Sequence, residues 1–274
     1  VSMPAFNMVG KLAARAAGVP DVPVVEYPGA VGIDHAEIRD KITSVLFERI
    51  VNALTRPIKP SASGKVADWD SKKIVFEGSL DAVNAHFHEM EWSDGLPIIP
   101  PTLERVQEFL KYTDRSADEV IAVLPQMNLR ATVWNIAANG VMAGCRPQTM
   151  PILVATVEAL QEDKFNLDNI GTTWGITPYV FLNGPIVKEL GFNDGAGLIS
   201  RGANPSLGRA LGLIIRNIGG YRPARNQMGT FGYPINFCFA ENEDLNPWEP
   251  YHVEKGFDRR TSTVSVSTTM NWGF

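Results

Sequence analysis

The apolar positions near the start of the chain follow helical spacing, then strand spacing, then helical spacing again. Residues 8–18 contain helix formers and end at Gly18, and residues 21–29 form a short β-rich run closed by a Pro-Gly pair. A second helix begins at Asp34, whose side chain is a good cap, and its apolar residues recur every three or four positions. This spacing predicts one buried face, formed by Ile38, Ile42, Val45, Leu46, Ile50 and Leu54.

From residue 69 onward, strand-like and helix-like segments alternate, which is typical of an α/β domain. Two helical segments, residues 131–144 and 150–162, contain many apolar or small residues and are predicted to lie in the core. Thr102 is a predicted cap, and another helix begins at Asn204. The predicted strands are residues 72–78, 120–125, 172–184 and 235–240, and the remaining predicted helices are residues 79–90 and 103–112.

The pattern divides the chain into two structured parts and a linker. Residues 1–55 predict a partial α/β unit of helix, strand and helix. A lone strand has no sheet of its own, so we expect it to pair with strands from the rest of this chain or from another chain. Residues 56–68 are rich in Pro, Ser and Gly and predict a linker. Residues 69–274 predict the main α/β domain.

Composition narrows the class of partner. The chain has 274 residues, of which 45% are hydrophobic, so it can bury a large core. Its formal charge is −5 and its Lys and Arg residues are scattered, which argues against nucleic acid as a partner. Without an apolar run of about 18 to 20 residues, no membrane span is expected, and we predict a cytoplasmic protein with a small-molecule substrate. Its two cysteines, Cys145 and Cys238, form no metal-ligand motif, so the sequence assigns no metal or cofactor.

A glycine-rich loop precedes the helix that begins at Asn204. Gly195, Gly197 and Gly202 flank Arg201 there, and Asn204 is the predicted N-cap. Free backbone N–H groups, a helix N-terminus and a guanidinium could together bind the carboxylate or phosphate of a substrate. Alternatively, the glycines only allow the loop to turn and Arg201 is a surface residue. Neither nucleotide-binding fingerprint occurs in this stretch, so a nucleotide is the weaker prediction.

Cys145 and Arg146 lie in the short connection between the two apolar helices. A thiol near a cation and near helix N-terminal amides has a lowered pKa, so Cys145 is a candidate reactive thiolate. The alternative is that Cys145 is a small buried apolar residue, and this alternative is stronger for Cys238 within an apolar run.

An acid-rich segment follows the last predicted strand. Residues 237–257 contain Glu241 and several other acidic residues, together with Trp248 and His252. Prolines interrupt this stretch too often for it to form a long helix. Glu241 and His252 could act as general acid and base, or the same residue types could bind a metal ion. The alternative is a rigid acidic loop that Trp248 anchors to the core.

Several ungapped blocks carry a family resemblance. They resemble the bacterial family of UGSC-motif proteins, which is named for a selenocysteine or cysteine in a U/C-G-S-C thiol motif. The resemblance covers most of residues 90–257, and the segment from Met3 to Ala30 looks like the tail of that family's thiol-bearing domain. The blocks are DGLPIIPPT, TVWNIAANGVMAGCRP, NGPIVKELGFN, ANPSLGRALGLIIRNIGG and AENEDLNPWEPYHVEKGF.

The thiol motif itself does not occur in this chain. The resemblance therefore implies that a separate or cleaved partner chain supplies the missing strands and the thiol, in a hetero-oligomer with thiol or redox chemistry. The family usually has acidic residues where this chain has Trp134 and Gln148, and a basic residue where it has Gly202, with Arg201 one position earlier. The family's matching positions are Cys145, Arg146, Asn204, Arg209, Glu241, Asn242, Trp248 and His252. The candidate catalytic residues are Glu241, His252 and Cys145, and the candidate substrate-binding residues are Arg146, Arg201, Asn204, Arg209, Asn242 and Trp248.

Three functional hypotheses follow. The favoured one is the larger subunit of a heteromeric enzyme, in which Arg146, Arg201 and Arg209 help to bind a small anionic substrate and Glu241 and His252 supply acid–base groups. The partner chain would supply a thiol nucleophile or redox centre. The second is a lyase or hydrolase, metal-assisted or not, that uses the acids of residues 241–252 without a thiol. The third is a non-catalytic binding or scaffold subunit.

Overall fold

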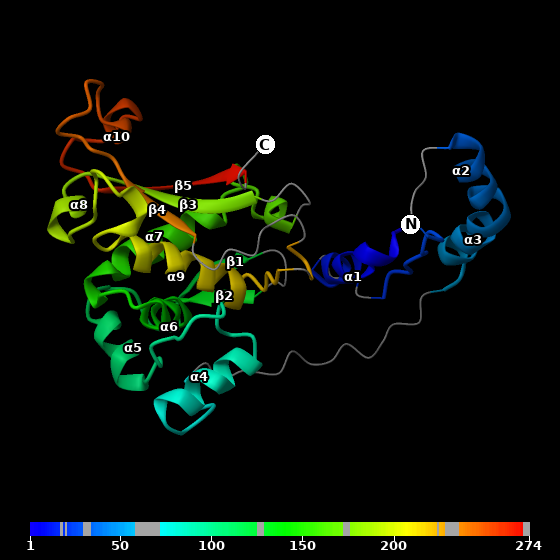
Figure 1. The fold of residues 1–274 in the computed structure, drawn as a ribbon, viewed down its shortest axis with the longest axis horizontal. Coiled ribbons are helices and arrows are strands. Elements are labelled where there is room, and N and C mark those ends of the chain that lie inside the picture. The colour runs from blue at the N-terminus through cyan, green and yellow to red at the C-terminus, as the bar shows by residue number, and fades with distance from the viewer. Residues whose placement is uncertain are drawn as a thin grey trace. The chain divides into compact units, whose positions relative to one another are not determined.

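The computed structural model divides the chain into two compact units, Val1–Trp69 and Asp70–Phe274 (Figure 1). The predicted linker, residues 56–68, lies outside the described residues from residue 58 onward. The structure describes residues 1–16, 19, 21–29, 34–57, 72–124, 129–171, 176–223, 225–227 and 236–270.

The first unit is mainly helical. A 3₁₀ turn, Pro4–Phe6, leads into α1, Asn7–Ala16. The second helical stretch consists of α2, His35–Lys41, a π-helical turn, Ile42–Leu46, and α3, Phe47–Thr55. Asp34 caps it as predicted, because its carboxylate accepts a 2.8 Å hydrogen bond from the Ala36 N–H. The segment predicted as a strand forms only one parallel bridge, between Ser2 and Glu26, so the strand prediction is wrong within the described residues.

Few apolar side chains of this unit are buried. The buried described residues are Ala14, Tyr27 and Leu46. The predicted burial of one helix face is therefore confirmed for Leu46 and wrong for Ile42 and Leu54, of which Leu54 is 81% exposed. The helix keeps its apolar spacing, but the described residues supply no cover for most of that face.

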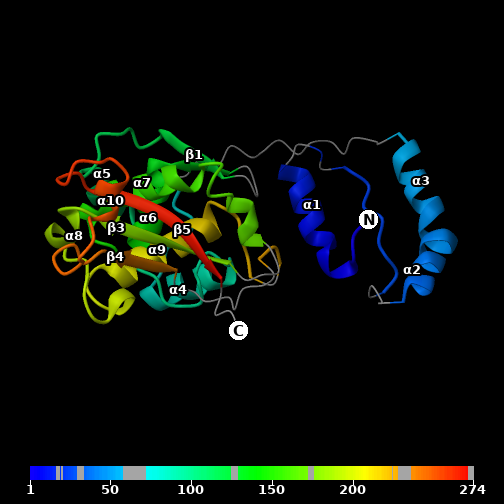
Figure 2. The same cartoon turned by 90° about the horizontal axis from the view of Figure 1, so that it is seen from above.

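The second unit contains a three-stranded mixed sheet with strand order β4–β3–β5 (Figure 2). β3, Ile176–Asn183, pairs in parallel with β4, Phe237–Ala240. β5, Thr263–Met270, pairs antiparallel with β3 and was not predicted, although its alternating residues fit a strand. The register places Leu182 opposite Ala240 and Asn183 opposite Thr263.

A separate antiparallel pair consists of β1, Val120–Leu124, and β2, Leu129–Thr132. β1 confirms the strand predicted there. The strand predicted at residues 72–78 is wrong, because its described residues join no ladder. Phe76 instead stacks on the His86 ring, with a centroid distance of 4.5 Å.

Four helices pack on one side of this sheet in successive layers (Figure 1). α7, Met150–Leu160, and α9, Asn204–Asn217, contact the strands. α6, Val133–Ala143, packs behind them, and α5, Leu103–Leu110, packs against α6 (Figure 1). The remaining elements are α4 Leu80–Glu89, α8 Ile186–Glu189, α10 Tyr251–Glu254, and the 3₁₀ turns Pro147–Thr149, Leu167–Gly171 and Leu198–Ser200.

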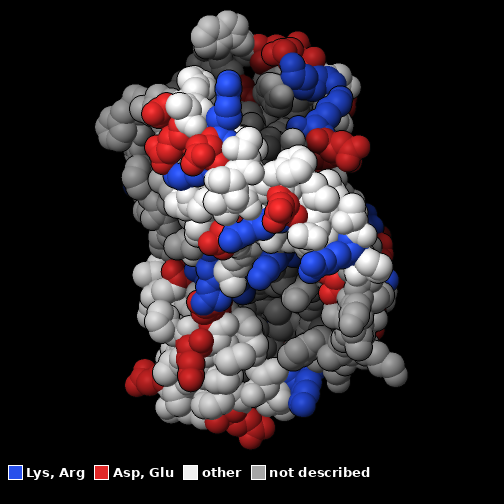
Figure 3. All heavy atoms as spheres, turned by 90° about the vertical axis from the view of Figure 1, so that its right-hand side faces the viewer, with Lys and Arg blue, Asp and Glu red and all other residues white. Residues whose placement is uncertain are grey.

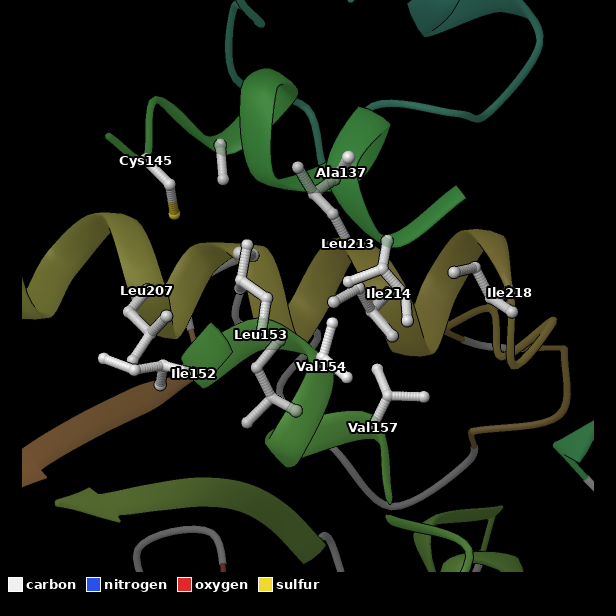
Figure 4. Packing of buried hydrophobic residues seen from close by; sticks show 14 of the residues in the cluster. Ala137, Cys145, Ile152, Leu153, Val154, Val157, Leu207, Leu213, Ile214 and Ile218 are labelled. Carbon is white, nitrogen blue, oxygen red and sulfur yellow. The ribbon is translucent and has the colours of Figure 1, made fainter. Parts of the chain in front are cut away.

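Buried aliphatic side chains fill the space between α6, α7 and α9 (Figure 4). Gly140 allows α6 to approach α7 closely, and Gly208 allows α9 to approach the backbone just before β4. A Cβ on Gly140 of α6 would lie 2.6 Å from Leu153 Cδ1, and one on Gly208 of α9 would lie 2.0 Å from the Asn236 carbonyl oxygen. The packing confirms that the two apolar helices predicted for the core lie there, and the chain has an α/β fold.

The surface carries charges of both signs. On the face drawn in Figure 3, Lys and Arg side chains lie beside Asp and Glu side chains. Among the described helices, none is long and apolar enough to cross a membrane.

Candidate functional site

The acid-rich segment begins where two parallel strands end. β3 ends at Asn183 and β4 ends at Ala240, and these residues lie at the same edge of the sheet. The Glu241 N–H extends the ladder by one hydrogen bond of 3.1 Å to the Leu182 carbonyl oxygen. Polar residues that follow the two strands therefore meet at the carboxyl edge, where α/β sheets commonly bind ligands. We call Asn183, Glu241, Glu243 and His252 the strand-edge cluster.

Glu241 fixes the loop to the sheet. Its Oε2 accepts hydrogen bonds from the Asn183 side-chain amide and, at 2.9 Å, from the Tyr251 N–H. Its Oε1 accepts one from the Asn246 side-chain amide. Because both oxygens are occupied by internal donors, Glu241 is better placed to organise the loop than to exchange a proton with a substrate.

Glu243 has one occupied and one free oxygen. Its Oε1 accepts hydrogen bonds from the Gly184 N–H at 2.7 Å and from the Asn183 amide at 3.2 Å. Its Oε2 makes no hydrogen bond with the described residues, and 21% of the side chain is exposed. Sequence reasoning did not assign Glu243 a role; its position three residues after β4 was the available signal.

His252 lies in α10 behind Glu243, and only 1% of it is exposed. Its Nε2 lies 3.4 Å from the Arg259 carbonyl oxygen, which can only accept, so a hydrogen bond here requires the tautomer with the proton on Nε2. Its Nδ1 lies 3.6 Å from Glu243 Oε1, within ion-pair range but too far for a hydrogen bond. One proton on Nδ1 or on the carboxyl would make this contact attractive.

Buried polar atoms in and beside the cluster lack hydrogen-bond partners among the described residues. They are His252 Nδ1, Asn183 Oδ1 and Thr263 Oγ1, which belongs to the residue paired with Asn183 across β3 and β5. Buried polar atoms without partners are uncommon in native proteins. Their concentration at one edge of the sheet distinguishes this place from the surrounding core.

The exposed part of the segment is ordered by short polar contacts. Trp248 is 78% exposed, so the prediction that it anchors the loop to the core is wrong. Its backbone N–H donates to Asn246 Oδ1 at 3.1 Å, and the Leu245 N–H donates to Asn242 Oδ1 at 3.0 Å. Asn242, a predicted substrate ligand, therefore stabilises a turn with its side-chain oxygen. The loop is therefore held by asparagine side chains that accept hydrogen bonds from nearby backbone N–H groups, and not by the apolar anchor that the sequence predicted.

The ligand set for a metal ion is not assembled in the part of the chain that the structure describes. No three His, Cys, Asp or Glu side chains lie together there as a metal site would need. The metal-assisted alternative therefore stays a prediction.

Asn204 ties the glycine-rich loop to the sheet. It is fully buried and is the first residue of α9; the N-cap is Ala203, which corrects the predicted cap by one position. Its Oδ1 accepts from the Asn193 N–H at 2.7 Å, and its Nδ2 donates to the carbonyl oxygens of Asn193 and Cys238 at 3.0 and 3.1 Å. The Asn204 side chain is thus used within the protein.

The arginines predicted to bind an anion do not converge. Arg209 forms a bidentate ion pair with Asp94, at 2.8 and 2.9 Å, and also donates to the Pro97 carbonyl oxygen at 2.9 Å. Arg146 donates to the Leu190 carbonyl oxygen at the end of α8. Arg201 is exposed and has no ion pair or hydrogen bond with any described residue. The turn at Asp94 supplies a carboxylate for Arg209 that the sequence reasoning did not consider.

Cys145 is buried at the end of α6 and its side chain faces α9 (Figure 4). Burial raises the pKa of its thiol to about 12, although hydrogen bonds with Ser206 and Thr149 act in the opposite direction. The predicted lowering of the Cys145 pKa is therefore wrong, because desolvation outweighs the nearby donors and the Arg209 charge. Burial also raises the pKa of Cys238.

An open groove of about 530 Å³ lies elsewhere on the second unit. Tyr112, Arg115, Pro151 and Glu158 are among its lining residues, and none of the strand-edge cluster lines it. Arg115 is already paired with Glu119 at 2.7 Å and with Glu158 at 2.5 Å. The groove therefore offers little uncompensated charge.

Comparison with protein-family models, curated proteins and solved structures finds no match to this chain. Function is consequently argued from the site and not from the fold. The resemblance to the UGSC-motif proteins stays a prediction.

Proposed function

We propose that this chain is an enzyme subunit that performs acid–base chemistry at the strand-edge cluster, with Glu243 as the group that transfers a proton and His252 as its positioning residue. The observation that carries the proposal is the buried His252 Nδ1, which lies 3.6 Å from Glu243 and has no hydrogen-bond partner among the described residues. Burying a ring nitrogen without a hydrogen-bond partner lowers the stability of the fold. Proteins keep unfavourable features of this kind mainly at functional sites.

The geometry supports a defined division of labour. The Gly184 N–H and the Asn183 amide hold Glu243 Oε1, so Oε2 is oriented and free for a substrate. With a proton on Oε2 the Glu243 carboxyl could act as an acid, and after loss of that proton the carboxylate could act as a base. Glu241, with both oxygens occupied, would keep the loop in place.

A partner chain is part of the proposal. Phe47, Val51 and Leu54 are exposed at i, i+4 and i+7 on α3, which is the spacing of a helix face that packs against another element. This supports a heteromeric enzyme in which another chain covers that face. Because burial raises the pKa of both cysteines here, a thiol step on a small anionic substrate would need the partner's thiol.

The lyase or hydrolase alternative uses the same Glu243 and His252 and differs in needing no thiol. The scaffold alternative gives neither residue a chemical role. The presence of a partner chain distinguishes the heteromeric thiol enzyme from the lyase or hydrolase. The activity of a Glu243 variant distinguishes both enzymes from the scaffold.

The test uses tagged wild-type protein isolated from its source organism with whatever chains accompany it. The complex is incubated with a metabolite extract of the same organism, and depleted compounds are measured by mass spectrometry. We expect Glu243→Gln to slow depletion about 10²- to 10⁴-fold, the usual effect of removing an acid–base group. The matched control is Glu189→Gln, which changes an exposed glutamate of α8 and should leave depletion unchanged.

Depletion at the wild-type rate by the Glu243→Gln protein would overturn the acid–base proposal. Denaturing mass spectrometry of the same sample identifies every chain present. A single chain species would overturn the heteromeric part while leaving the acid–base part standing.

A further inference from the structure

Three arginines surround Glu91 at the end of α9. Arg225 pairs with the Glu91 carboxylate at 2.6 Å, and Arg222 Nε lies 4.0 Å from its other oxygen. Arg216, in the last turn of α9, donates to the Glu91 carbonyl oxygen at 3.3 Å. Sequence reasoning missed this group, although three arginines on either side of a Gly-Gly pair were a visible signal.

Positive charge exceeds negative charge in this group. The charges that act on Arg222 are those of Arg216, Arg225 and Glu91, and Asp94 also acts on Arg216. The neighbouring Asp94 is already held by Arg209 in a bidentate pair. The group therefore has an excess charge of about two positive units, counted from these side chains.

Each guanidinium also keeps an unused donor. Arg222 Nη1 donates to the carbonyl oxygens of Arg216 and Tyr221, which offsets part of the negative end of α9. Its Nη2 makes no hydrogen bond with the described residues, and the same holds for Arg216 Nη2 and Arg225 Nη1. A local capping role thus explains one nitrogen of Arg222 and leaves one terminal nitrogen on each arginine available.

Burial makes this excess charge unfavourable. Arg216 and Arg222 are both partly buried, and burial lowers the pKa of each. The pKa of Arg222 falls to about 10, with the Arg216 charge as the second cause. An anion at this place would remove the penalty, because it supplies the missing opposite charge and accepts the free N–H groups.

We propose that Arg216, Arg222 and Arg225 form a binding site for an oxyanion, the phosphate or carboxylate group of a small molecule. The site is separate from the strand-edge cluster and goes beyond the proposed acid–base function. Asn204 contacts β4 at the start of α9, and the arginines lie at the other end of this 14-residue helix, about 20 Å away at 1.5 Å per residue. Tyr221 beside them donates to the Leu167 carbonyl oxygen in the 3₁₀ turn Leu167–Gly171.

The test is calorimetric titration of the full chain with inorganic phosphate and, in parallel, with succinate, at low ionic strength. We expect Arg222→Gln to weaken binding at least about tenfold, as expected for loss of a charge-assisted contact, and Arg225→Gln to weaken it about fivefold. Glu91→Gln should strengthen binding several-fold, because it removes the competing carboxylate. Arg201→Gln, at the arginine of the glycine-rich loop, is the control and should bind like wild type.

The two ligands distinguish a phosphate site from a carboxylate site, and tighter binding of either supports the proposal. If Arg222→Gln does not fold, Arg225→Gln and Glu91→Gln still decide the question with opposite expected signs. Absence of binding by both ligands, or binding that only Arg201→Gln weakens, would overturn the proposal.

Discussion

The strand-edge cluster and the glycine-rich loop contain the same kinds of residue, yet the structure treats them differently. In α9, which follows the loop, Asn204 and Arg209 find partners inside the protein for the donors and acceptors that would otherwise bind a ligand. In the cluster, His252 Nδ1 and Asn183 Oδ1 are buried without such partners. A polar residue in a promising motif therefore indicates a site only when its hydrogen-bonding capacity is left over after folding.

The largest expected effect is the loss of folding stability when Arg209 of α9 is replaced. Arg209→Ala leaves Asp94 buried without its partner, and we expect a loss of about 3–5 kcal/mol in the free energy of unfolding, measured by urea denaturation. Arg201→Ala, eight positions away and exposed, should change this free energy by less than about 0.5 kcal/mol. Equal stability of the two variants would mean that Arg209 is not a structural residue and would break the comparison.

A smaller loss is expected from Asn204→Ala. It removes three hydrogen bonds that join α9 to Asn193 and β4, and we expect a loss of about 2–3 kcal/mol in the same measurement. Asn242→Ala is the matched control, because it removes one bond in an exposed turn and should cost about 1 kcal/mol or less. A larger loss for Asn242→Ala would contradict the assignment of Asn204 as the tie between loop and sheet.

The buried thiol of Cys145 makes stability depend on alkaline pH. Its pKa in the folded protein is about 12, against about 8.5 in an unfolded chain. Its contribution to stability is therefore complete below about pH 8.5 and is lost progressively as the pH rises toward 12. Wild type should lose stability faster than Cys145→Ala over this range in urea titrations. Parallel slopes for the two proteins would argue against a buried neutral thiol.

The smallest effect is expected at Trp248. Its side chain is exposed, so Trp248→Ser should leave the free energy of unfolding within about 0.5 kcal/mol of wild type. A loss of several kcal/mol would restore the anchoring role that the sequence predicted.

The elements with strong local signals could be predicted from the sequence. The cap at Asp34, the cap at Thr102 and the apolar helices α6 and α7 are all present in the structure. β5 alternates apolar and polar residues and was missed. The extended run around Ile74 was predicted as a strand because its composition is β-like, but strand formation also needs a neighbouring strand, which local sequence does not reveal.

The candidate site was predictable only in part. The position of Glu241 and His252 after a strand located the cluster correctly in the sequence. The contact between Glu243 and His252, and the pairing of Arg209 with Asp94, depend on residues that lie far apart in the chain or on opposite sides of a turn. Cys145 was misjudged because desolvation is a tertiary effect.

The most direct test compares the free energies of unfolding of His252→Leu and Asn204→Leu. Leu removes a buried polar group and fills a similar volume at each position. If His252 is retained for function, its replacement should leave stability within about 1 kcal/mol of wild type or raise it, whereas Asn204→Leu should lose about 3 kcal/mol. A loss for His252→Leu as large as that for Asn204→Leu would show that His252 is structural and would contradict the account.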